Sequence, residues 1–131
     1  MKYQLSDILR NLFFIFICLC YNKSSEVDNF MLARLHVILA SEDEADYQKV
    51  KDELYNINSD FSISPSREYM GLKGHSEFYI TCDLQKNQVQ PLLDQLNNDW
   101  NGEIDDCICC GFNTKMFDSL VYYLGFTLFD E

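Results

Sequence analysis

The sequence predicts an α+β domain, a ferredoxin-like sandwich in which two helices cover one face of an antiparallel sheet. The first observation is the order of the periodic segments, which run strand, helix, strand, strand, helix, strand, with an extra C-terminal strand. The second is the half-polar alternation of the first and third strands, which indicates a sheet with one open face. The third is composition: 47% hydrophobic residues, with only five Gly and two Pro, favour long regular elements around a real core.

The first strand and helix are predicted over the segment that follows Met31. Residues 32–40 alternate in polarity and predict a strand. Ser41 is the expected N-cap of the next helix, and Glu44 is placed to complete a capping box. Apolar residues at helical spacing then form one stripe that should face the sheet: Tyr47, Val50, Leu54 and Ile57.

A short strand and a long strand follow. Residues 61–63 open a second strand, and Pro65 suits an edge of the sheet rather than its centre. Residues 71–74 have the glycines of a hairpin turn. Residues 77–84 alternate cleanly and predict a third strand, with these residues facing inward: Phe78, Ile80, Cys82 and Leu84.

The second helix is expected over residues 87–100, with Asn87 as its cap and Pro91 tolerated in its first turn. Its predicted buried stripe consists of Val89, Leu92, Leu93, Leu96 and Trp100. A fourth strand is predicted over residues 104–112. Residues 120–129 are read as a fifth strand because they are rich in Tyr, Phe, Val and Thr, with a buried helix as the rival interpretation.

We predict two regions, an N-terminal extension over residues 1–30 and an acidic α/β domain over residues 31–131. The extension contains ten consecutive apolar residues, Leu12–Tyr21, whereas a membrane-spanning helix needs about 20. We therefore expect no membrane span. The run can be a signal-like segment or a docked helix, or Met31 can be the natural start of the protein.

The formal net charge of -11 lies entirely in the predicted domain, because residues 31–131 carry 18 acids against 7 bases. Such a field attracts basic partners and repels nucleic acid and anionic membranes. Arg34, His36 and Tyr79 are expected on the open sheet face, but they lack the basic surroundings of an RNA-binding sheet. The acids expected to contact a basic partner form two groups along the chain: Glu42, Asp43, Glu44 and Asp46, then Asp99, Glu103, Asp105 and Asp106.

Few residues point to catalysis or to a cofactor. His36 and His75 have no nucleophile at a motif spacing, and no glycine loop for phosphate is present. We therefore expect neither an enzyme nor a cofactor. Thiolates of Cys107, Cys109 and Cys110 are a weak alternative as metal ligands, and free buried thiols in a reducing, cytoplasmic compartment are the simpler interpretation.

This acidic domain resembles in format the bacterial immunity proteins of contact-dependent growth inhibition and related polymorphic toxin systems. Two segments suggest the resemblance, the capped acidic helix start Ser41–Asp46 and the closing run Thr114–Leu124. The resemblance implies an antitoxin that covers a cognate basic toxin, often a nuclease, and occludes its active site. We expect a monomer or weak dimer. The alternatives are a small-molecule-sensing regulatory domain of ferredoxin-like topology and a metal-handling protein that uses the cysteines above.

Overall fold

The computed structural model describes residues 30–111 and 115–129 of the 131-residue chain. The chain divides between Phe30 and Met31 into two units, and the second unit contains every described strand and helix. The elements follow one another as β1 (Met31–Leu39), α2 (Glu44–Ile57), β2 (Ser62–Ile63), β3 (Arg67–Glu68), β4 (Ser76–Leu84), α3 (Lys86–Leu96), β5 (Asn101–Glu103), β6 (Asp106–Cys110) and β7 (Val121–Phe129). The class is α+β.

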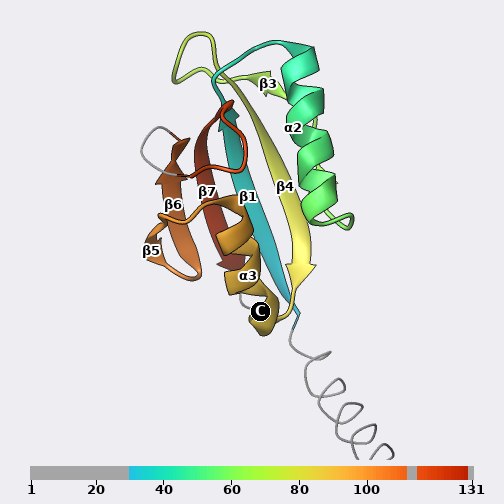
Figure 1. Cartoon of the computed structure of the whole chain (residues 1–131), viewed down its shortest axis with the longest axis vertical. Helices are drawn as coiled ribbons and strands as arrows, with labels where there is room; N and C mark the ends of the chain where they lie inside the picture. Colours follow the sequence, from blue (N-terminus) through green and yellow to red (C-terminus); the bar gives the residue numbers. More distant parts are fainter. Residues whose placement is uncertain (1–29, 112–114, 130–131) are drawn as a thin grey trace, which may run out of the picture. The chain divides into compact units, whose positions relative to one another are not determined.

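The strands form one open antiparallel sheet in the order β2-β4-β1-β7-β6-β5, and β3 also pairs with β4 (Figure 1). β1 lies in the middle, where its nine residues pair with β4 from Met31 opposite Leu84 to Leu39 opposite Ser76. On its other side β1 pairs with β7. The short strands lie at the two edges, as expected for the Pro65-containing segment.

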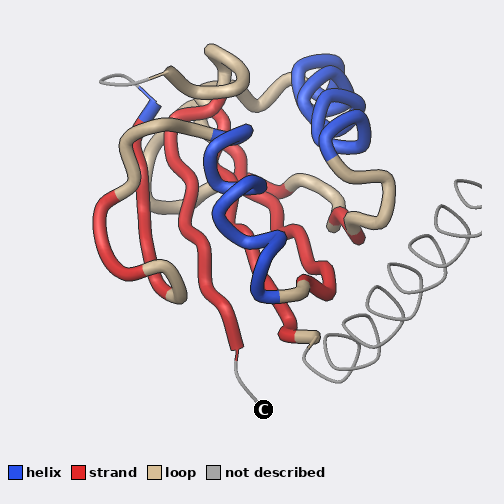
Figure 2. Tube along the Cα trace, turned by 60° about the horizontal axis from the view of Figure 1, so that its bottom comes forward, coloured by secondary structure: helices blue, strands red, loops and turns tan. Residues whose placement is uncertain are grey.

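Both helices pack on the same face of the sheet (Figures 1 and 2). The core combines alternate residues of the central strands with one stripe from each helix. From the strands it takes Ala33, Leu35, Val37, Leu39, Phe78, Ile80, Leu84, Val121, Leu124 and Phe126; from the helices it takes Tyr47, Val50, Leu54, Val89, Leu92, Leu93 and Leu96. The predicted strand and helix periodicities are therefore confirmed for these elements.

The prediction of Ser41 as N-cap is wrong, because Asp43 caps α2 and accepts a hydrogen bond from the Ala45 N–H at 2.9 Å. The Ser41 hydroxyl instead accepts from the Asp43 N–H at 3.0 Å and donates to Asp46 at 2.6 Å. The capping box with Glu44 does not form. The Asp43 carboxylate stands directly before the helix and reaches its free N–H groups, which the Ser41 hydroxyl, two residues further upstream, does not.

The predicted start and end of the second helix are also wrong. α3 begins at Lys86 with Gln85 as its N-cap rather than Asn87, and the Gln85 N–H donates to Gln88 Oε1 at 2.8 Å. Trp100 lies beyond the helix. Its indole N–H donates to the Leu93 carbonyl oxygen at 2.9 Å, so the half-buried ring packs under the end of the helix.

The strand predicted over residues 104–112 is confirmed for β6 (Asp106–Cys110), but its predicted start is wrong and a further strand precedes it. Residues 101–110 form a hairpin of β5 and β6, with Ile104 and Asp105 in its turn. Gly102 has φ +118, and a Cβ there would lie 2.5 Å from the Asp106 carbonyl oxygen, so the pairing requires glycine. The position beside β1 is taken by β7, which settles the rival interpretations of residues 120–129 in favour of a strand.

The predicted turn at residues 71–74 lies between β3 and β4, where Gly74 has φ +80. Of the helices in the described part of the chain, neither combines the length and apolar character needed to cross a membrane. The predictions that concern Leu12–Tyr21, Phe112 and Thr114 fall outside the described residues.

Candidate functional site

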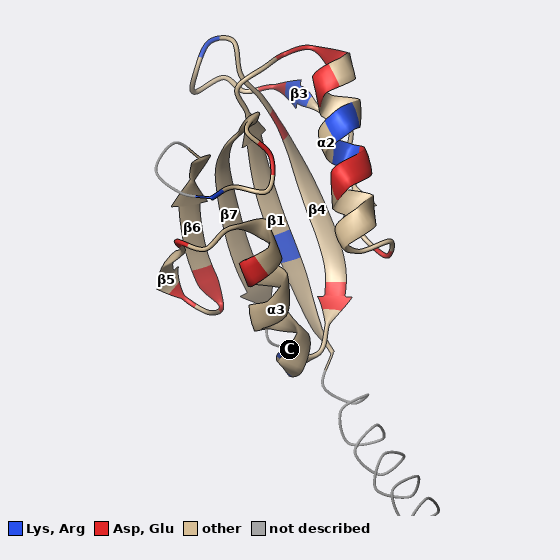
Figure 3. Cartoon of the chain, in the orientation of Figure 1, with Lys and Arg blue, Asp and Glu red and all other residues tan. Residues whose placement is uncertain are grey.

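The structure separates the eight predicted partner-contacting acids into two surfaces. The α2 acidic cluster consists of Glu42, Asp43, Glu44 and Asp46, and the hairpin acidic cluster consists of Asp99, Glu103, Asp105 and Asp106. Figure 3 shows the first where α2 begins and the second around β5 and β6, at the other edge of the sheet. The two acidic clusters therefore lie on separate parts of the domain.

The α2 acidic cluster has structural uses. Asp43 caps the helix, Asp46 accepts a hydrogen bond from the Ser41 hydroxyl, and Glu44 accepts one from the Gln48 amide at 3.3 Å. Negative charge at this position also stabilises the helix through its dipole. Only Glu42 in this cluster is exposed without such a role.

The hairpin acidic cluster is different, because its four side chains are exposed and form no ion pair with any described Lys, Arg or His. Ile104 and Ile108 of the same hairpin are 53% and 45% exposed. Ile108 alternates with the core residues Cys107 and Cys109 and so lies on the open face of the sheet. Ile104 instead adjoins a hollow of about 290 Å³ that is also lined by Trp100 and Glu103. Exposed apolar side chains beside unpaired carboxylates are features of specific protein interfaces.

The cysteines are divided between the two faces of β6. Cys107 and Cys109 are buried in the core, whereas Cys110 alternates to the open face and is half-buried. Burial raises the pKa of Cys107 to about 11 and that of Cys109 to about 12, so both are protonated thiols near neutral pH. Residues 30–111 and 115–129 contain no group of three or more His, Cys, Asp or Glu arranged to hold a metal ion.

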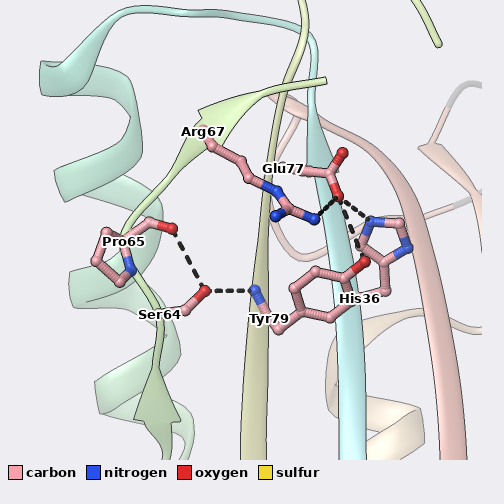
Figure 4. A network of polar contacts seen from close by, with 6 residues as sticks. All are labelled: His36, Ser64, Pro65, Arg67, Glu77 and Tyr79. Atoms are coloured by element: carbon pink, nitrogen blue, oxygen red, sulfur yellow. Dashed lines mark hydrogen bonds and ion pairs between the residues drawn. The ribbon is translucent and has the colours of Figure 1, made fainter. Parts of the chain in front are cut away.

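A polar network lies on the open face of the sheet, and sequence reasoning missed it. Glu77 lies on this face beside His36, Arg67 and Tyr79 (Figure 4). It is only 8% exposed. Its Oε1 atom lies 3.2 Å from Arg67 Nη2, 3.4 Å from His36 Nε2 and 3.4 Å from the Tyr79 hydroxyl, which donates to it. The neighbours across β1, β3 and β4 supply these partners, which periodicity in one strand cannot reveal.

Aromatic stacking completes this network. The His36 ring stacks on Tyr79 with centroids 4.5 Å apart, and Tyr123 meets His36 edge-on at 5.7 Å. The guanidinium carbons of Arg34 and Arg67 each lie 5.8 Å from the Tyr79 ring centroid. Burial lowers the pKa of His36 below its ordinary value against the opposing effect of Glu77, so the ring is neutral near pH 7.

Next to this network is a hollow of about 420 Å³, which we call the tyrosine hollow. Its walls are His36, Ile38, Tyr69, Gly71, Leu72, Tyr122 and Tyr123. The ring of His75 lies edge-on to Tyr122 at 5.0 Å and supports the outer wall. Burial raises the pKa of Tyr123, so its hydroxyl is protonated near neutral pH.

A pair of carboxyl groups lies between α2 and the segment before β7. The hydrogen bond with Asp118 and burial raise the pKa of Glu53 to about 7. Burial alone would raise the pKa of Asp118, but hydrogen bonds with Glu53, the Leu120 N–H and Lys49 hold it below its ordinary value. Lys49 Nζ lies 3.2 Å from Asp118 Oδ2. These two carboxyl groups share one proton near neutral pH.

Comparison of the chain with protein families, with curated proteins and with solved structures finds no match. Functional inference therefore depends on the surfaces described above.

Proposed function

We propose that this chain is an immunity protein that binds a cognate basic toxin domain, a nuclease in the simplest case, and neutralises it by occluding its active site. The observation that carries the proposal is the hairpin acidic cluster around Ile104 and Ile108. Binding requires no turnover and no cofactor. The partner is a protein, and nucleic acid is repelled by the same charge.

The charge of the domain and the exposed residues of its hairpin both support binding to a basic protein. A domain that holds the whole net charge of -11 steers a basic protein toward it and accelerates encounter. The hairpin carboxylates have no ion pair to break in the described part of the chain, so a toxin's Lys and Arg side chains can pair with them directly. The exposed Ile104 side chain in the hairpin turn would then supply an apolar contact beside them.

We also infer a ferredoxin-like core, made of β1, α2, β2, β4, α3 and β7, to which the β5–β6 hairpin is an addition. The order β2-β4-β1-β7, with a helix after β1 and a helix after β4, supports this inference. In this description the added hairpin carries the binding surface. The free thiols of the described cysteines support a reducing, cytoplasmic location.

The test compares two variants with equal change of charge. The hairpin variant neutralises D99N, E103Q, D105N and D106N, and the control variant neutralises D52N, D60N, E68Q and D83N, which are exposed elsewhere. The full chain is titrated with the basic toxin domain encoded beside it, at two salt concentrations, and the protection of toxin-producing cells is scored. Trp100, the single tryptophan, lines the hollow beside Ile104 and reports binding by fluorescence.

We expect the hairpin variant to lose at least about tenfold in affinity, together with protection, while the control loses only roughly twofold to threefold through weaker steering. An equal loss in both variants would mean that charge acts generally and that the hairpin is not the contact surface. If the chain captures no basic partner from its own host and protects against no adjacent toxin, the immunity function is wrong.

A small-molecule-sensing regulatory domain is the second candidate, because the tyrosine hollow has the size of a ligand site. A metabolite that raises the melting temperature of the full chain, without any protein partner, would favour it. No observation in the described residues favours metal handling.

A further inference from the structure

The tyrosine hollow presents a chemistry that neither acidic cluster supplies. Tyr69, Tyr122 and Tyr123 contribute three phenol rings from two separate segments, and Leu72 and Ile38 close the walls between them. The faces of aromatic rings attract cations within about 6 Å of the ring centroid. None of the seven lining residues is Lys or Arg, so the walls contribute no positive charge of their own.

His36 adds a hydrogen-bond acceptor to these walls. Its Nε2 atom is buried and lies 3.4 Å from Glu77 Oε1, without the geometry of a hydrogen bond. Figure 4 shows the second ring nitrogen on the side away from Glu77. In the neutral ring, a proton on Nε2 leaves Nδ1 as an acceptor. Glu77 is also paired with Arg67 at 3.2 Å, so His36 contributes chiefly this acceptor.

The hollow also lies at the end of the sheet where the α2 acidic cluster begins. Ile38 lines the hollow near the end of β1, and the chain continues directly into Ser41 and Glu42. The Ser76 hydroxyl donates to the Ser41 carbonyl oxygen at 2.6 Å and fixes this connection against β4. The exposed carboxylate of Glu42 thus follows within four residues of one wall.

We propose that the tyrosine hollow is a socket for an organic cation, an ammonium or guanidinium group, and that its occupant is a lysine or arginine side chain of the basic partner. This inference rests on the proposed function and deepens it, because it adds a second point of attachment over the central strands β1 and β7. Aromatic π faces and an imidazole acceptor are groups that recognise a protonated nitrogen on an apolar stem.

The experiment uses the full chain labelled with ¹⁵N and three probes of matched size. The methylamides of Nα-acetyl-lysine and Nα-acetyl-arginine carry the cation, and that of Nα-acetyl-norleucine is the uncharged control. We expect saturable shifts of the Tyr69, Leu72 and Tyr122 amide signals with both cations and none with norleucine. The Y122L variant removes one exposed ring, and Y55L is its match, since Tyr122 and Tyr55 are 36% and 37% exposed.

Y122L should weaken binding of the cationic probes by about threefold to tenfold, Y122F should retain it, and Y55L should leave it unchanged. Equal shifts with norleucine, no shift with either cation, or unchanged binding in Y122L would each overturn the socket. A free biological amine that binds the hollow with micromolar affinity would overturn the assignment of the occupant to a protein side chain.

The same variants separate this inference from the proposed function. If the basic toxin binds the chain and Y122L does not change its affinity, the socket is wrong and the immunity function stands. If both cationic probes bind the hollow and no basic protein partner exists, the immunity function is wrong and the cation site stands.

Discussion

Replacing Glu53 with glutamine should stabilise the domain at pH 8 and leave its stability unchanged near pH 5. The hydrogen bond with Asp118, together with burial, raises the pKa of Glu53 from its ordinary 4.5 to about 7. A carboxyl group with a raised pKa in the folded state stabilises the fold fully below 4.5, and that stabilisation is lost as the pH rises through about 7. Glutamine keeps a donor toward Asp118 and never ionises.

The magnitude follows from the pKa and from solvent exposure. A pKa difference between 4.5 and about 7 corresponds to an upper bound of about 3 kcal/mol for a fully buried group. The Glu53 side chain is 36% exposed, so solvent screens much of the repulsion between the two carboxylates. We therefore expect E53Q to gain about 1 kcal/mol at pH 8, which for a domain of this size is a rise in Tm of roughly 4–8 °C.

Urea unfolding at pH 5, 6, 7 and 8 measures the effect, with D52N as the matched control. Asp52 is exposed on the same helix, and neutralising it removes one negative charge without touching the pair. The advantage of E53Q over the wild type should grow with pH and the effect of D52N should stay flat. A difference between E53Q and wild type that does not change across this range would show that Glu53 is ionised in the folded domain at all of these pH values, which refutes the shared proton.

Two further outcomes follow from the hairpin and from the core. G102A should destabilise the β5–β6 hairpin by about 1–3 kcal/mol, because alanine disfavours the φ of +118 and its Cβ would lie 2.5 Å from the Asp106 carbonyl oxygen. Urea unfolding measures the loss of stability. G74A is the control for backbone conformation alone, because a Cβ at residue 74 meets nothing within 4 Å. Cys107 and Cys109 should resist alkylation by iodoacetamide at pH 8 in the folded chain, and Cys110 should react before either of them. Burial raises the pKa of the two core thiols to about 11 and about 12. Peptide mass mapping distinguishes the sites, and early modification of Cys109 would contradict its place in the core.

Periodicity along the chain predicted the elements whose side chains divide cleanly between core and solvent. β1, α2 and β4 were predictable because Val37, Leu54 and Phe78 belong to unbroken apolar patterns. The hairpin of β5 and β6 was not, because residues 101–110 are short, polar and cysteine-rich, and their turn depends on the conformation of one glycine. Periodicity within one segment does not show which strands become neighbours, so the position of β7 between β1 and β6 comes from the structure alone.

The availability of the predicted partner-contacting acids also depends on contacts that the sequence does not reveal. Acidic residues are easy to find in a sequence, but only the structure distinguishes carboxylates already used by the fold from those that remain available. Asp43 and Asp46 accept hydrogen bonds that hold the start of α2, so a partner that pairs with them competes with a helix cap. Glu77 and Asp118 were unremarkable in the sequence, yet both are buried beside cations that lie far from them along the chain.

In the proposed complex, this difference sets the order in which the two acidic clusters should contribute to binding. Pairing with the hairpin acidic cluster removes only water and ions from exposed carboxylates, whereas pairing with Asp43 or Asp46 also removes a bond worth about 1 kcal/mol from the fold. The hairpin should therefore govern affinity, and the α2 acidic cluster should act through its field, mainly on the rate of encounter. The proposed socket in the tyrosine hollow, over the central strands β1 and β7, needs no such displacement, so we expect it to be the more effective second contact.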